Sequence, residues 1–350
     1  MHIELNSNFQ YVETILFNIA GCIDFCANSL LIYLILFKSA TMHNFRFYML
    51  YFQASTFLVD IYLTLLMKPI PIFPVIGGYT IGLLSTVFHV SSHIQMTVIL
   101  VLMSVQVVAI WCSFLRKHQT IVSIDGRKVL GTKTYWSLIV LPHFGVITGS
   151  LMFYFSNISK EEQIQFIRNN IPQLGSQLAQ LPCLQIYDRV GKPIVIYSLL
   201  VLLFQETFFF TCVFVLAIDI FTTLRNNHVT VSSGNMGKHR AMFRSLFAQF
   251  IVLLFCFLPS CVGIIILIFD IPYIQEVSGA LLCIYSIHSF LGCIVMIFTY
   301  QPYWNTILLW LGLSKNGLDG SPSIFVMKGK QSRLSIRKIR SWFNECKVVF

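Results

Sequence analysis

Long hydrophobic runs separated by short polar segments dominate the chain. Seven of them reach the roughly 20 residues that a helix needs to cross the hydrocarbon layer of a bilayer. They cover 14–37, 47–68, 82–110, 135–155, 193–221, 246–269 and 277–300. None shows the ten-residue alternation of membrane β-strands. The pattern predicts an all-α membrane protein with a seven-transmembrane helix bundle.

The spans divide the chain into three parts. Residues 1–13 form an N-terminal segment, 14–300 the transmembrane domain and 301–350 a tail. The first part has no Lys or Arg, whereas a cleaved signal peptide begins with basic residues, so we expect the first run to be retained as a span. Neither the tail nor 156–192, the longest connection, is long enough to bury a core of its own.

Lys and Arg residues are distributed unevenly between the two sides of the predicted bundle. The segments after spans one, three, five and seven contain 2, 5, 4 and 8 of them, which is 19 of the 24. Cytoplasmic segments carry such an excess. We therefore expect the N-terminus outside and the C-terminus inside.

Composition supports a membrane protein and argues against nucleic-acid binding. The chain is 56% hydrophobic and only 11% charged, whereas soluble domains average about 25% charged residues. Its net charge of +10 is explained by the inside-positive segments and their attraction to anionic lipid. We expect membrane lipid, and no nucleic acid, among its partners.

One aspartate interrupts the second span. Asp60 lies eight residues before Lys68, which is about 12 Å along a helix. An ionisable side chain at that depth faces the bundle interior and has partners, and Asn28 in the middle of span one is the nearest candidate. Both a purely structural role and a role in switching remain open.

Prolines follow this span. Pro69, Pro71 and Pro74 cannot continue a helix, so we expect them to end it. The next residues, GGYTIG (77–82), predict a turn into span three.

Three stretches resemble the nematode serpentine chemoreceptors, most closely class I and then class H. They are MHNFRFYMLYFQASTFLVDIYLTLLMKPIPIFPVIGGYTIGLL (42–84), FLRKHQTI (114–121) and YQPYW (300–304). The resemblance implies a seven-helix G-protein-coupled receptor for olfaction. Such a receptor binds a small odorant or pheromone-like ligand, activates a heterotrimeric G protein, and resides in the plasma or ciliary membrane of sensory neurons.

The broader rhodopsin-like pattern is matched only in part. Asn28 and Asp60 resemble its polar pair, and CFLP (256–259) resembles its Cys-Trp-x-Pro. Arg116 has no adjacent acid, and YQPYW (300–304) replaces the usual Asn-Pro-x-x-Tyr.

Three groups of residues are candidates for receptor function. The switch candidates are Asn28, Asp60, Phe257, Pro259, Pro302 and Tyr303. The ligand-pocket candidates are His89, His93, Gln95, Gln205, Glu206 and His288. The G-protein-facing candidates are Arg116, Lys117, Arg225, Lys238, Arg240 and Arg244.

Some of these residues allow more than one interpretation. Pro259 is expected to kink span six, either as a pivot or to fit its packing. His89 and His93 lie one turn apart on the expected third span, where interhelical hydrogen bonding and ligand contact are alternatives. A metal site needs a third ligand, and none is evident, so we expect no metal and no cofactor.

Asn157 and Cys183 lie in the predicted outer connection 156–192. Asn157 begins the Asn-Ile-Ser sequon and is a glycosylation candidate. The usual receptor disulfide needs a cysteine near the top of span three, and 69–110 has none. Cys183 is therefore free, pairs with a span-end cysteine such as Cys22 or Cys283, or joins another chain.

The tail contains two amphipathic stretches. Trp304, Ile307, Leu308 and Leu311 share a helical face, which predicts a short helix on the inner membrane surface. The basic stretch 333–343 is either lipid- or partner-binding or merely solvated, and Cys346 is a possible acylation site.

Two other function classes fit the chain less well. A ligand-gated channel or transporter of seven spans is the alternative, although the chain lacks repeats and a charged pathway. The chain has no HExxH or Gly-x-Ser-x-Gly motif, so we expect no enzyme.

Overall fold

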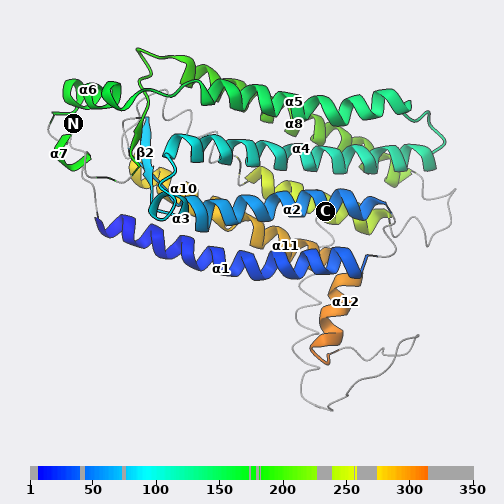
Figure 1. The fold of residues 1–350 in the computed structure, drawn as a ribbon. Coiled ribbons are helices and arrows are strands. Elements are labelled where there is room, and N and C mark those ends of the chain that lie inside the picture. Colours follow the sequence, from blue (N-terminus) through cyan, green and yellow to red (C-terminus); the bar gives the residue numbers. More distant parts are fainter. Residues whose placement is uncertain are drawn as a thin grey trace.

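The bundle predicted from hydropathy is present in the computed structural model (Figure 1). The structure describes residues 7–39, 44–72, 76–172, 175–178, 181, 183–226, 239–255, 257 and 274–313. Within these, the helices long and apolar enough to cross a membrane are Gln10–Phe37, Phe45–Met67, Ser92–Ile124, Thr132–Tyr154, Ile194–Asn226 and Ser278–Thr299. The segment 239–255 is also helical and leads into the predicted sixth span. The prediction of an all-α membrane protein is confirmed.

Helix α4 (Ser92–Ile124) is the central element of the bundle. It packs against α2 (Phe45–Ile61), α5 (Thr132–Tyr154) and α8 (Ile194–Asn226). Its buried apolar residues between Val107 and Leu115 belong to the largest hydrophobic cluster of the described residues. A helix that is apolar on all sides is typically buried, and α4 is accordingly surrounded by α2, α5 and α8.

The expected start of span three at residue 82 is wrong. Residues 83–91 instead form a short helix, α3 (Leu83–Thr86), and a turn, and α4 begins only at Ser92. Ser91 is the N-cap, because its side-chain oxygen accepts a hydrogen bond from the Ile94 amide at 3.4 Å. Hydropathy therefore located the apolar run, whereas the cap determines where the helix begins.

The second span ends where the prolines predicted. Helix α2 continues into a π-helical segment, η2 (Tyr62–Met67). At Lys68 the backbone turns into the left-handed region with φ 45°. Pro69 then begins strand β1 (Pro69–Pro71).

Residues 77–80 form a strand rather than the expected turn. Strand β2 (Gly77–Thr80) is the middle of an antiparallel sheet with order β1-β2-β3, where β3 is Gln185–Ile186. A Cβ atom on Gly77 or Gly78 would lie 2.6 Å from a backbone oxygen of a neighbouring strand. The two glycines thus permit close strand approach.

The sheet belongs to a small cap at one end of the bundle, which we call the sheet end (Figure 1). The cap includes α6 (Lys160–Asn170) and α7 (Gly175–Leu178). Its apolar cluster comprises Ile70, Ile72, Tyr79, Ile167, Leu178 and Ile186. Neither connection buries a core alone, but 69–80 and 156–192 build one together.

The last span consists of two helices, α10 (Ile274–Ser286) and α11 (His288–Thr299), which pack against α1 (Ser7–Phe37). Helix α12 (Gln301–Trp310) follows and turns away from the bundle at the opposite end, the tail end (Figure 1). A short helix is present where one was predicted, with Pro302 in its first turn, and its place on the inner membrane surface stays a prediction.

Several predicted features fall outside the described residues. These are Pro259, Lys238, the basic stretch 333–343 and Cys346. Cys183, Cys22 and Cys283 are all free thiols in the structure.

Candidate functional site

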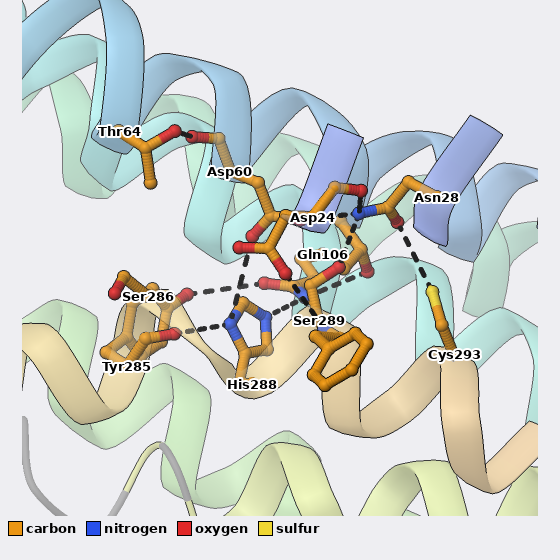
Figure 2. Close-up of polar contacts among 12 residues, drawn as sticks. Asp24, Asn28, Asp60, Thr64, Gln106, Tyr285, Ser286, His288, Ser289 and Cys293 are labelled. Carbon is orange, nitrogen blue, oxygen red and sulfur yellow. Dashed lines mark hydrogen bonds and ion pairs between the residues drawn. The ribbon is translucent and has the colours of Figure 1, made fainter. Parts of the chain in front are cut away.

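A polar network lies within the apolar bundle where α1, α2 and α11 meet (Figure 2). Its centre is Asn28, whose side-chain nitrogen lies 3.0 Å from Asp60 Oδ2 and 2.7 Å from Ser289 Oγ. The same nitrogen lies 2.8 Å from the backbone oxygen of Asp24. The structure thus joins Asn28 and Asp60 as expected, and their role in switching stays a prediction.

Gln53 of α2 completes the contacts of Asn28. Its side-chain nitrogen donates to Asn28 Oδ1 at 2.5 Å and lies 3.5 Å from Cys293 Sγ on α11. Asn28 and Gln53 are both buried. The Asn28 side chain therefore links three helices through both ends of its amide.

Asp24 is a member of this network that the sequence analysis missed. Its Oδ1 accepts a hydrogen bond from the Phe290 amide at 3.0 Å. Phe290 lies in the first turn of α11, where backbone amides lack partners within the helix and negative groups are favoured. Asp24 precedes Asn28 by four residues, a spacing that puts both on one helical face, and that spacing was the available signal.

His288 connects the network to α4. Its Nε2 lies 3.0 Å from Gln106 Nε2, and an amide nitrogen can only donate, so the imidazole accepts there. The ring hydrogen is therefore on Nδ1, which lies 2.6 Å from the backbone oxygen of Tyr285 and 3.9 Å from Asp60 Oδ1. This predicted pocket residue thus belongs to the same interior network as the switch candidates (Figure 2).

His93 bridges three segments at the sheet end. Its Nε2 donates to the backbone oxygen of Tyr154 at 2.9 Å, and its Nδ1 lies 2.9 Å from the Tyr187 hydroxyl. Its ring stacks on Phe153 with centroids 5.4 Å apart. Burial raises the pKa of Tyr187 well above its usual range, so this hydroxyl stays neutral and donates to His93. Both ring nitrogens are thereby used within the protein.

His89 does not lie one helical turn from His93, so that expectation is wrong. It precedes α4, is exposed and has a left-handed backbone with φ 52°. The reason is the N-cap at Ser91, which starts α4 after His89.

Gln95 is buried and fastens the segment before α4. Its side-chain nitrogen donates to Ser85 Oγ at 2.9 Å and to the Val90 backbone oxygen at 2.7 Å. Its Oε1 is buried without a hydrogen-bond partner.

Gln205 and Glu206 on α8 face different neighbours. Glu206 Oε1 accepts from Ser104 Oγ of α4 at 3.2 Å. Gln205 lies against Gly145 and Gly149 of α5. The two residues therefore do not line one common surface.

Lys117 is turned into the bundle at the tail end. It is 2% exposed, and its Nζ lies 3.1 Å from His239 Nδ1 and 5.2 Å from the centre of the Phe45 ring. Cations are attracted to aromatic faces at such distances. Lys117 thus connects α4 with the helix 239–255 and α2.

The other basic candidates differ in exposure. The Arg240 guanidinium donates to the Leu224 backbone oxygen at 2.7 Å and so supports the end of α8. Arg225 and Arg244 are exposed, and Arg116 is partly buried. Arg225 and Arg244 therefore present their charge to solvent at the tail end.

An ion-pair cluster that sequence analysis missed holds the connection after α4. Arg127 Nη1 lies 3.2 Å from both carboxylate oxygens of Asp219, and Arg127 Nε lies 2.7 Å from Asp125 Oδ2. His118 Nε2 lies 2.7 Å from Asp219 Oδ2. Asp219 of α8 therefore joins the end of α4 and the connection after it through His118 and Arg127.

The remaining switch candidates pack into the bundle. Phe257 lies against Phe210 of α8, with ring centroids 4.8 Å apart. Tyr303 is fully buried, and its hydroxyl hydrogen-bonds the side chain of Ser39. Tyr303 thus attaches α12 to the end of α1.

The described residues contain no group of three or more His, Cys, Asp or Glu side chains placed to hold a metal ion. Polar groups joined across membrane helices, with basic side chains at one end, are typical of a helical membrane protein.

Comparison with known families identifies the receptor class. Residues 1–307 match the family described as serpentine type 7TM GPCR chemoreceptor Sri. The chain therefore belongs to this family of seven-transmembrane chemoreceptors, which are receptors and not enzymes. The match confirms the resemblance to serpentine chemoreceptors and the chain's place in the membrane. Among curated proteins, no relative matches the chain.

Proposed function

We propose that this chemoreceptor binds a small odorant or pheromone-like molecule and activates a heterotrimeric G protein. The observation that carries the proposal is the interior network centred on Asn28, which links α1, α2 and α11 and reaches α4 through His288. Because it contacts several helices at once, a change in their packing must exchange its hydrogen bonds. Such a discrete exchange is what a two-state receptor needs.

The ligand would act by binding one packing better than the other, since equal affinity for both shifts nothing. Glu206 faces α4 and Gln205 faces α5. His93 of α4 contacts Tyr187, which follows strand β3. We place the ligand among the sheet-end halves of these helices. His89 and Gln95 border this region, and His288 would transmit the change inward.

The transducer would bind at the tail end, with Arg225 and Arg244 as the exposed contacts. This orientation places residues 1–13 outside and 301–350 in the cytoplasm, where α12 lies on the membrane surface. The proposal rests on the excess of Lys and Arg at this end. We further propose the plasma or ciliary membrane of sensory neurons as its location.

A signalling assay tests the function. Cells expressing the receptor with individual G-protein α subunits are challenged with pooled volatile and water-soluble metabolites. We expect a ligand-dependent response that disappears without the matching subunit. A ligand-dependent current that persists without any G protein would instead favour a channel.

Tags at the two ends test the orientation. We expect an N-terminal tag to be labelled by antibody on intact cells and a C-terminal tag only after permeabilisation. The physical reason is the cost of translocating the basic segments. Labelling in the opposite order would invert the proposed topology.

Glycosylation of Asn157 is a separate prediction. Asn157 is exposed at the sheet end, where its Oδ1 accepts from Gln185 Nε2 at 3.1 Å. We expect glycosidase treatment to increase the electrophoretic mobility of the wild-type receptor. Asn157→Gln and Ser159→Ala should abolish this shift.

Ser159→Thr is the matched control, because Ser159 also caps α6 through its hydrogen bond with the Glu162 amide. Threonine retains both the sequon and the cap. Wild-type mobility that does not respond to the glycosidase would contradict the prediction.

A further inference from the structure

A small cavity with both polar and apolar lining side chains lies between α2, α4, the helix 239–255 and α11. Among the described residues, its lining includes Gln53, Thr56, Gln106, Gln249, His288 and Gly292, and no Asp, Glu, Lys or Arg. About 10 Å³ of it is open to the centre of a water-sized sphere, which is near the lower limit for holding one water molecule. Its size and lining therefore suit one small neutral guest.

Gln249 lines this cavity and carries an unused hydrogen-bond acceptor. The residue is 3% exposed, and its side-chain nitrogen lies 3.1 Å from Met296 Sδ. Its Oε1 is buried without a hydrogen-bond partner. A buried acceptor without a donor destabilises the folded state, so a hydrogen bond to this oxygen would stabilise the receptor.

The neighbouring amides have no hydrogen left to give. The Gln106 nitrogen already donates to Thr56 Oγ1 at 2.9 Å and to His288 Nε2. The Gln53 nitrogen is directed to Asn28 and Cys293. The Thr56 hydroxyl likewise donates to the Phe52 backbone oxygen at 3.0 Å. A guest is therefore a suitable source of the donor for Gln249.

We propose that this cavity binds one water molecule, which donates a hydrogen bond to Gln249 Oε1. The second hydrogen of the water has an acceptor in Thr56 Oγ1 or Ser289 Oγ, both of which line the cavity and have a second lone pair. The water thereby fastens the helix 239–255 to the polar network of α2, α4 and α11. This inference is independent of the ligand and of the G protein.

Gly292 lines the cavity and offers a way to displace the water. A Cβ atom built on Gly292 meets no described atom within 4 Å, so alanine is accommodated without a clash and takes up space beside the cavity. In an exposed or dry site, Gly→Ala stabilises a helix. If water is displaced and Gln249 loses its donor, the effect has the opposite sign.

The first experiment compares thermal unfolding of the purified full-length receptor in lipid nanodiscs. We expect Gly292→Ala to lower the midpoint by about 2 to 4 °C. In a Gln249→Met background, Gly292→Ala should raise the midpoint of unfolding, because methionine has no buried amide oxygen that would lose its hydrogen-bond donor. A double-mutant cycle isolates this coupling. A midpoint raised equally in both backgrounds would overturn the proposal.

Radiolytic hydroxyl labelling gives a second, direct readout. Radicals formed from a bound water react where the water lies, so Phe52 in the cavity lining should be oxidised several-fold faster than Phe114. The two side chains are 5% and 0% exposed, and Phe114 does not line the cavity. Gly292→Ala should bring the rate at Phe52 down to that at Phe114. Equal rates in the wild-type receptor would refute the bound water.

Discussion

Asp60→Asn reaches the cell surface at close to the wild-type level in our expectation, whereas Asp60→Leu is retained inside the cell. Asparagine has nearly the same volume as aspartate. Its side-chain oxygen can still accept the hydrogen bond from Asn28 Nδ2, which lies 3.0 Å from Asp60 Oδ2 in the wild-type structure. Leucine removes that acceptor. Asn28 Nδ2 keeps the Asp24 backbone oxygen and Ser289 Oγ, whereas the Ser289 side chain loses its hydrogen bond with Asp60. Each buried polar group left unpaired costs about 1–3 kcal/mol, which is a large part of the stability of a typical protein.

Surface labelling of tagged variants, compared with total expression, measures this effect. The two substitutions are matched, because both remove the carboxylate and only one removes the hydrogen-bond acceptor. Equal surface levels for both would show that hydrogen bonding at Asp60 does not support folding. A folded Asp60→Asn variant also allows the switching role of the carboxyl group to be tested separately.

Reversing both exposed arginines at the tail end should abolish signalling without affecting ligand binding. Arg225 and Arg244 are exposed, so Arg225→Glu with Arg244→Glu leaves interior packing intact. An interface that places like charges together loses several kcal/mol, and each 1.4 kcal/mol is tenfold in affinity. We expect the maximal response to fall by about tenfold or more.

Arg168→Glu is the matched control, because Arg168 is exposed on α6 at the sheet end. It should leave signalling unchanged. Arg240 and Lys117 are unsuitable for this test, since Arg240 bonds the Leu224 backbone oxygen and Lys117 is buried beside His239. Full signalling by the double variant at normal surface levels would remove Arg225 and Arg244 from the proposed transducer surface.

Two buried polar side chains of α1 hold α11 in place. Asp24 caps α11 from α1, and Asn28 reaches Ser289 from the same helix face. Movement of α11 must therefore break contacts from both. Because hydrogen bonds between membrane helices are individually worth only about 0.6 kcal/mol on average, such an exchange is energetically accessible.

The sequence alone determined the membrane bundle and the buried pair. A span must be continuously apolar to lie in lipid, so the hydrophobic runs reveal the helices with little ambiguity. The same cost makes Asp60 and Asn28 conspicuous, because a carboxyl or amide within a span needs an interior partner. The end of the second span was also predictable, because the prolines after Lys68 lack the backbone N–H that a helix needs.

Only the tertiary structure decided which side chains those groups meet and where local elements begin. Asp24, Gln53 and His288 join Asn28 and Asp60 because helices far apart in sequence pack side by side, and hydropathy does not encode that packing. The strand at Gly77–Thr80 forms because it pairs with Pro69–Pro71 and Gln185–Ile186. The glycines of this segment predict a turn from local sequence alone, and its pairing partner Gln185–Ile186 lies about a hundred residues away in the connection 156–192. Burial in lipid is a property of each segment, whereas hydrogen-bond partnership is a property of the assembled bundle.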